Sequence, residues 1–153
     1  MSIYAILLLI ILLYVYISYY YRYPPNTKIL QAESDTLDTN LLYDKHPIIL
    51  LQNSKTLEDL KKSYFTYLIA DSKPVIKISE WNKNKYKYLL IQPTTACEIH
   101  ILPANKKLTD DETLITLQLN PSQVLILPFH WQFYTDTTIN TIGIHDYLSY
   151  FLP

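Results

Sequence analysis

Few residues of this chain could perform chemistry: four histidines and one cysteine among 153 residues. Glu98 and His100 stand two residues apart in a segment that is typical of a strand, so their side chains should share one face of a sheet. With only one cysteine in the chain, any metal site would have to be built from His and carboxylate side chains such as these two. Cys97, just before them, is expected to be a buried small residue. The sequence therefore offers part of a metal site.

The composition excludes several common activities. The chain has one glycine and one cysteine. Glycine-rich phosphate loops, dinucleotide-binding fingerprints and nucleophile elbows need several glycines, and an intrachain disulfide or a thiolate zinc site needs two or more cysteines. The net charge of -1 gives no basic footprint for nucleic acid, so we expect no nucleic-acid partner.

The N-terminal segment predicts a membrane anchor. The 19 residues from Ile3 to Tyr21 carry no charge. A helix of that length is roughly 28 Å long, about the thickness of the hydrocarbon core of a bilayer. Bulky rings follow the apolar run, where a cleaved signal peptide would have small residues. We therefore expect residues 1–22 to form an uncleaved membrane anchor. We expect its lipid-facing and interfacial residues to include Ile3, Leu8, Leu12, Tyr19, Tyr20, Tyr21 and Arg22, with the tyrosines in the headgroup layer.

The flanking charges favour one orientation of this anchor. Arg22 and Lys28 follow the span, and no charged side chain precedes it. The positive-inside bias therefore predicts a single-pass protein whose C-terminal domain lies on the cytosolic side. The lack of an Asn-x-Ser/Thr acceptor and of a second cysteine agrees with this side, because Asn120-Pro121-Ser122 is disqualified by its proline.

Residues 23–46 are expected to form a polar stalk. Pro24-Pro25 stiffens the exit from the membrane, and QAESDTLDTN is polar and has no period. Residues 47–153 suffice for one domain.

The pattern of residues 47–153 predicts a mainly β domain with a short helix. Pro47 to Leu51 is typical of a buried strand, and Ser54 to Lys62 of a short helix capped by Thr56. A last segment from His145 to Leu152 is expected to form a short helix capped by Asp146 or an amphipathic tail. This many short strands favours a double-sheet barrel of the jelly-roll type. The predicted strands are 64–70, 75–79, 86–92, 97–102, 114–119, 124–127, 131–134 and 139–144.

The basic and aromatic run from Trp81 to Tyr88 has two interpretations. Its lysines and rings could contact nucleic acid or lipid headgroups, or they could form a solvated hairpin. The balanced charge of the domain favours the hairpin.

Residues Thr116 to Tyr134, TLQLNPSQVLILPFHWQFY, carry a resemblance to a known family. They resemble the second half of the cupin barrel of the JmjC and asparaginyl-hydroxylase type, in which a strand, Pro-Gly-Asp, a strand ending in Ile-Pro-Pro, a turn residue and Trp-Trp-His follow one another. Pro121-Ser122-Gln123 falls on Pro-Gly-Asp, Leu127-Pro128-Phe129 on Ile-Pro-Pro, and His130 on the turn residue. Trp131 falls on the first Trp, Gln132 on the second and Phe133 on the His.

The departures from this family pattern bear on function. The final His of the pattern is a metal ligand in active members, and Phe133 stands in its place. The family's other ligands come from a His-x-Asp or His-x-Glu pair, of which Glu98-Ile99-His100 is a reversed relative. A substitute site would use Glu98, His100 and His130. We expect instead a domain without metal or cofactor, because a fold that keeps its packing residues while losing its ligands is a scaffold or a binding module.

The function that these patterns favour is a membrane-anchored, non-catalytic structural or interaction module with a protein partner. The alternatives are an Fe(II)/2-oxoglutarate-type oxygenase that uses the substitute site, and a small-ligand-binding barrel with Trp131, Phe133 and Trp81 as stacking platforms. The composition, rich in Ile, Tyr, Lys and Asn and poor in Gly, is similar to that of membrane proteins of large DNA viruses. A viral membrane is the context that this similarity implies.

Overall fold

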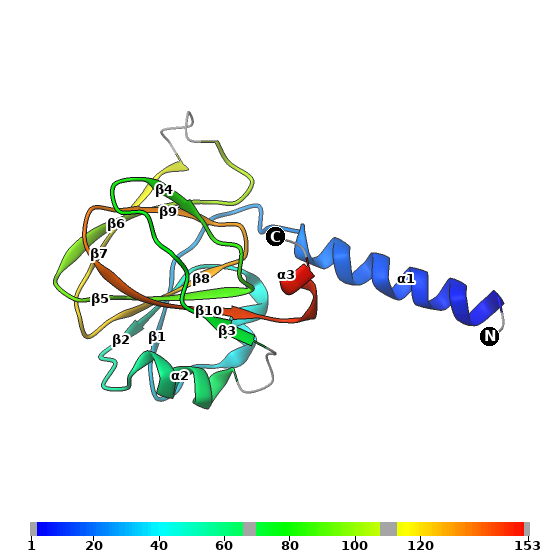
Figure 1. Ribbon diagram of the computed structural model, residues 1–153, viewed down its shortest axis with the longest axis horizontal. Coiled ribbons are helices and arrows are strands. Elements are labelled where there is room, and N and C mark those ends of the chain that lie inside the picture. Colours follow the sequence, from blue (N-terminus) through cyan, green and yellow to red (C-terminus); the bar gives the residue numbers. More distant parts are fainter. Residues whose placement is uncertain (1–2, 66–69, 108–112, 152–153) are drawn as a thin grey trace.

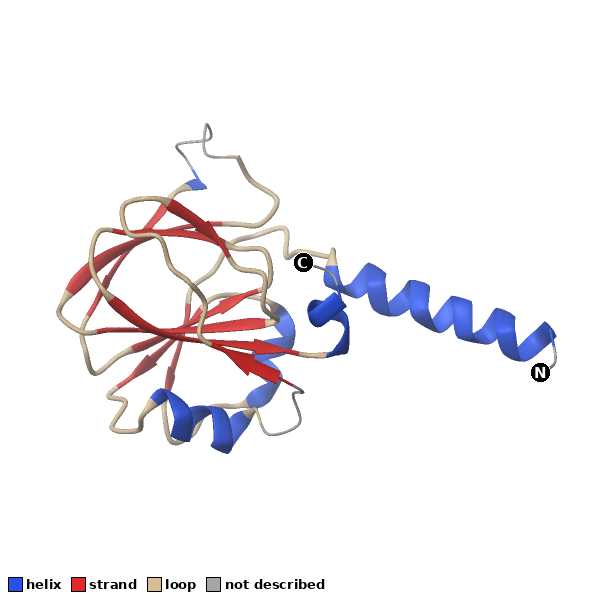
Figure 2. Ribbon diagram, in the orientation of Figure 1, coloured by secondary structure: helices blue, strands red, loops and turns tan. Residues whose placement is uncertain are grey.

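The structure is a computed structural model that describes residues 3–65, 70–107 and 113–151. A single long helix, α1 (Ile3–Tyr20), projects from a β-rich domain, and the C-terminal helix α3 (Tyr147–Phe151) lies beside the last turns of α1 (Figures 1 and 2). The helix begins in the apolar run and ends where the tyrosine cluster meets the domain. The helix α1 is therefore an apolar extension that joins the domain at its C-terminal end.

The domain contains two sheets. The six-stranded sheet has the order β1-β2-β8-β5-β10-β3, in which only the β1–β2 pair is parallel. The four-stranded sheet has the order β4-β9-β6-β7 and is antiparallel throughout. The strands are β1 (Leu30–Glu33), β2 (Ile48–Leu51), β3 (Ala70–Ser72), β4 (Trp81–Lys83), β5 (Tyr88–Pro93), β6 (Cys97–Leu102), β7 (Ile115–Leu119), β8 (Val124–Pro128), β9 (Gln132–Thr135) and β10 (Ile139–His145).

The six-stranded sheet is covered on both faces. Alternate residues of β5 separate to its two faces: Tyr88 and Leu90 join one core cluster, and Leu89 and Ile91 join the other. This two-sided burial explains why the central strands read as continuous apolar runs such as LLI and VLILP rather than as alternating patterns.

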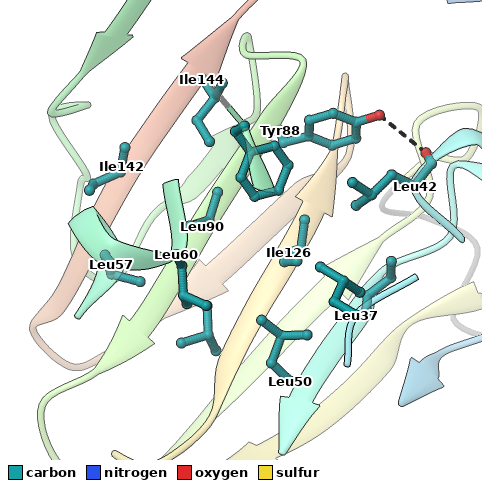
Figure 3. Packing of buried hydrophobic residues seen from close by; sticks show 13 residues of the cluster. Leu37, Leu42, Leu50, Leu57, Leu60, Tyr88, Leu90, Ile126, Ile142 and Ile144 are labelled. Atoms are coloured by element: carbon teal, nitrogen blue, oxygen red, sulfur yellow. Dashed lines mark hydrogen bonds between the residues drawn. The ribbon is translucent and has the colours of Figure 1, made fainter. Parts of the chain in front are cut away.

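The outer face of this sheet packs against helices. Leu57 and Leu60 of α2 (Leu57–Tyr64) lie over the strands, and Leu42 of the 3-10 helix η1 (Thr39–Asp44) closes the side (Figure 3). The Tyr88 hydroxyl donates a hydrogen bond of 3.2 Å to the Leu42 carbonyl. Residues of η1 and α2 thus cover the outer face of a sheet most of whose strands come later in the chain.

The inner face packs against the four-stranded sheet. The second cluster contains Trp131 and Phe133, which are 2% and 1% exposed, together with aliphatic residues of β5 to β8. Aromatic rings fill the space between the two sheets, so the interior on this side is a packed core.

The predictions for α2 and for six strands, β2 and β6 to β10, are confirmed. The Thr56 hydroxyl accepts the backbone N–H of Asp59, as expected of the N-cap. β6 to β10 begin and end within one residue of the predicted bounds. The turn at Asn120-Pro121-Ser122 separates β7 from β8, and Asp146 caps α3 by accepting the Ser149 N–H at 2.9 Å.

Residues 30–46 do not form a stalk. β1 pairs with β2 at the edge of the larger sheet, and Leu37 and Leu42 are buried in the core. Backbone pairing and the two leucines outweighed the polar composition that predicted a linker. The connection between α1 and the domain is therefore short, from Tyr21 to Ile29.

Other predictions for the middle of the chain are wrong. The 64–70 strand is replaced by the end of α2 and the start of β3, with residues 66–69 outside the described part. Residues 75–79 form no strand. The 81–88 segment is not a hairpin, because β4 and β5 belong to different sheets. The described strands form two facing sheets, neither of which closes on itself, so the structure does not confirm the predicted barrel.

The only glycine of the chain lies where a ring crosses a strand. Gly143 is in β10, and a Cβ there would lie 2.4 Å from the Tyr86 ring carbons Cδ1 and Cε1. The left-handed turn positions among the described residues are instead held by Lys45, Gln52, Ser79 and His130. Glycine is thus needed for close approach and not for a turn.

We predict that Gly143→Ala lowers the free energy of unfolding by about 1–3 kcal/mol, because the new methyl group overpacks the site beneath Tyr86. In a Tyr86→Ser background the same substitution should cost clearly less. Urea unfolding of the four proteins of this double-mutant cycle measures the coupling. An equal cost in both backgrounds would contradict the close approach.

Candidate functional site at the end of the apolar helix

The predicted metal ligands Glu98 and His100 lie on the outer face of the four-stranded sheet. Nε2 of His100 is 3.2 Å from Oε1 of Glu98, and its Nδ1 is 2.9 Å from the Thr116 hydroxyl. Gln118 donates to the other Glu98 oxygen at 2.6 Å. Both side chains share a face, as predicted, but they are engaged with neighbours on a partly exposed surface.

His130 has different neighbours. It sits at a left-handed turn position between β8 and β9, stacks on Phe129 with ring centroids 3.7 Å apart, and its Nδ1 lies 3.0 Å from the Tyr23 hydroxyl. Burial, aided by the charge of Lys83, lowers the pKa of His130 to about 4. The described residues include no group of three His, Cys, Asp or Glu side chains able to hold a metal ion. The structure therefore does not assemble the substitute triad.

The predicted stacking platforms differ in exposure, although Trp81 and Phe133 line one hollow of about 330 Å³. Trp131 and Phe133 are core residues. Trp81 is partly exposed on the edge strand β4, with its ring centroid 5.9 Å from that of Tyr134. The indole of Trp131 and the phenyl ring of Phe133 fill the space between the sheets, which leaves Trp131 without the open surface that a stacking platform needs.

A connected group of polar and aromatic contacts lies where α1 meets the domain. The buried ring of Tyr20 packs edge-on against Phe129, with centroids 5.2 Å apart. The Tyr19 hydroxyl donates to the Tyr43 carbonyl at 3.1 Å. Tyr20 is therefore buried against the domain, whereas the sequence suggested a ring exposed to lipid headgroups. We call this set of contacts the anchor junction; its residues are Tyr16, Tyr19, Tyr20, Tyr23, Lys45, Lys87, Phe129, His130, Asp146 and Ser149.

Lys45 caps the C-terminus of α1. Its ammonium group donates to the carbonyl of Tyr19, to that of Tyr20 at 3.1 Å and to that of Arg22 at 2.9 Å. The last carbonyls of a helix have no partner within the helix and carry the negative end of its dipole, so a cation there is stabilising. The ammonium also lies 4.2 Å from the centroid of the Tyr19 ring.

Asp146 joins three elements at the same place. Its carboxylate accepts from the Tyr16 hydroxyl at 3.0 Å and from the Ser149 backbone N–H at 2.9 Å, and it pairs with Lys87 at 3.1 Å. These partners belong to α1, to α3 and to the loop before β5. One carboxylate thus ties the apolar helix to the C-terminal helix and to the sheet.

Burial and neighbouring groups shift the pKa values of two charged side chains in the junction. Burial and the nearby Lys87 lower the pKa of Lys45 to about 8. Burial alone would raise the pKa of Asp146, but the Ser149 N–H and Lys87 outweigh it and hold that pKa at about 2. Asp146 is therefore fully charged at neutral pH.

The rest of α1 has no cover from the domain. The helix has a mean hydropathy of 2.2, and Tyr20 is its one buried residue. It is the one helix in the described part of the chain that is long and apolar enough to cross a membrane. Ile3, Leu8 and Leu12 are 74%, 59% and 59% exposed. Tyr21 and Arg22 follow the helix end and are exposed as expected of flanking residues. An apolar surface of this kind is unfavourable in water and matches lipid.

The sequence signalled only part of this junction. The cap at Asp146 could be predicted from its position before a short helix. Lys45 and Lys87 are far from α1 and gave no local signal, because their role depends on long-range packing.

Comparison with protein-family models, with curated proteins and with solved structures found no match to this chain.

We predict that Asp146→Asn lowers the free energy of unfolding by about 1–3 kcal/mol at pH 7, because Lys87 loses its charged partner. The folded pKa of Asp146 is below the ordinary 3.8, so its contribution is present above pH 4 and is lost as the pH falls towards 2. The difference between the parent and variant chains should therefore shrink over that interval.

Urea unfolding in detergent micelles, followed through the fluorescence of the tryptophans, measures this difference. Asp44→Asn, which changes an exposed carboxylate at the last residue of η1, is the control and should change little. A gap between parent and Asp146→Asn that stays constant from pH 4 to pH 2 would contradict the assignment.

Proposed function

We propose that this chain is a single-pass membrane protein whose α1 spans the bilayer and holds a non-catalytic, jelly-roll domain at the membrane surface for interaction with another protein. The observation that carries the proposal is the exposed apolar surface of α1 together with its docked and capped end. An apolar helix that did not have to position a domain would need no such junction. A spanning helix that must hold a domain in place does.

The strand order supports the jelly-roll part of the proposal. Taken in chain order, β3 to β10 are eight strands, arranged as β3-β10-β5-β8 in one sheet and as β4-β9-β6-β7 in the other. Two interlocked Greek keys of eight strands have this alternation between facing sheets. β1 and β2 extend the first sheet beyond β8.

The buried ring of Phe133 supports the non-catalytic part. In the cupin-like alignment this residue takes the place of a metal-ligating His, and its side chain lies in the core between the sheets. A phenyl ring has no lone pair for a metal, and Glu98 and His100 point outward instead. The domain is then a packed scaffold of cupin type rather than an oxygenase.

The charges around the junction support a cytosolic domain. Arg22 and Lys28 follow the span and are exposed, and Lys45 and Lys87 lie at the helix end. Positive residues next to a span favour the cytosolic side. At the opposite end of the domain, a hollow of about 640 Å³ lies between the start of α2 and the start of β10, where a partner protein has access.

We predict that Leu8→Arg combined with Leu12→Arg removes the chain from the membrane fraction. Each arginine at the centre of a spanning helix costs about 2.5–3.5 kcal/mol of insertion free energy. The parent chain should stay in the pellet after an alkaline carbonate wash, and so should the control Thr95→Arg in the turn between β5 and β6.

Release of the parent chain by carbonate would overturn the spanning assignment. In the same membranes, a Thr95→Cys variant in a Cys97→Ser background should react with a membrane-impermeant maleimide only from the cytosolic side. Reaction from the opposite side would overturn the orientation alone.

A further inference from the structure

The C-terminal helix α3 exposes an unusual amount of aromatic surface. Tyr147, Tyr150 and Phe151 are 72%, 61% and 72% exposed, although the helix has five residues. Its inward side is Ser149, which is buried and bonded to Asp146. Three large rings on one short helix form an apolar patch that no described part of the chain covers.

The anchor junction places the start of α3 beside the C-terminal turns of α1. Asp146, the N-cap of α3, is bonded to the hydroxyl of Tyr16, which lies one turn before the end of α1 at Tyr20. Figure 1 shows α3 beside this end of the helix. The start of α3 is therefore level with the last turn of α1 and not beyond it.

The length of α1 indicates how deep in a membrane its last turn and α3 would lie. Its 18 residues extend over about 27 Å, slightly less than the roughly 30 Å of a hydrocarbon core. Nearly the whole helix is needed to span, so its last turn lies at the boundary between hydrocarbon and headgroups. Elements level with that turn lie in the interface.

We propose that α3 is a second membrane contact, whose Tyr147, Tyr150 and Phe151 side chains insert into the interfacial layer of the leaflet next to the domain. The inference rests on the proposed spanning of α1. Tyrosine rings suit this layer because the ring lies among acyl chains while the hydroxyl reaches water. Arg22, which is exposed directly after the end of α1, favours a leaflet with anionic headgroups.

This second contact fixes the orientation of the domain. A single helix allows the domain to rotate about the helix axis and to tilt, whereas two contacts side by side hold one face of the domain against the lipid. The same face is then closed to protein partners, and the hollow near α2 remains open.

The test uses the full chain in nanodiscs of phosphatidylcholine and phosphatidylserine, in a Cys97→Ser background. An environment-sensitive fluorophore is attached to Tyr150→Cys, and lipids with a nitroxide at a shallow or a deep position quench it. Tyr147→Cys repeats the measurement at a second site of α3. Leu12→Cys in the centre of α1 and Thr95→Cys at the far end of the domain are the controls.

The labels at 150 and 147 should lose most of their fluorescence with the shallow nitroxide and less with the deep one. Leu12 should be quenched best by the deep nitroxide, and Thr95 by neither. Quenching at Leu12 without quenching at 150 and 147 would overturn the α3 contact and leave the anchor intact, with the patch then facing water or a protein. A Leu12 label that is not quenched would overturn the spanning assignment and the inference with it.

Discussion

The buried carboxylate of Asp146 determines how α1 and α3 lie against the domain. A charge that is 5% exposed is stable only with partners, and its partners come from α1, α3 and the loop before β5. Each of these bonds fixes one element against another. The position of the apolar helix, the capping of the C-terminal helix and the placement of Lys87 are consequences of satisfying one group.

The six-stranded sheet imposes a second constraint, because it is apolar on both faces. One face meets the four-stranded sheet, and the other must be covered by the remaining chain. α2, η1 and Leu37 provide that cover, which draws residues 30–46 into the domain. The connection to α1 is short as a result, and Lys45 arrives beside the helix end because it follows η1 directly.

The sequence predicts the elements whose signals are local. The apolar run of α1, the Thr56 cap and the short apolar strands from Cys97 to Ile144 are all visible as patterns of neighbouring residues. β1 was missed because its four residues are stabilised by parallel pairing with β2, which no local pattern encodes. The junction was missed for the same reason, since Lys45 and Asp146 are far from α1 in the chain. The burial of Phe133 between the sheets also depends on long-range packing, since its ring meets residues of several strands.

The central claim is that the domain is held in one orientation on the end of a spanning helix. The most direct test is the distance distribution between spin labels at Leu8→Cys in α1 and Thr95→Cys in the β5–β6 turn, measured by pulsed electron resonance in nanodiscs in a Cys97→Ser background. The account predicts one narrow distribution that broadens when Lys45→Met and Asp146→Asn are added. A distribution that is equally broad with and without those two substitutions would contradict it.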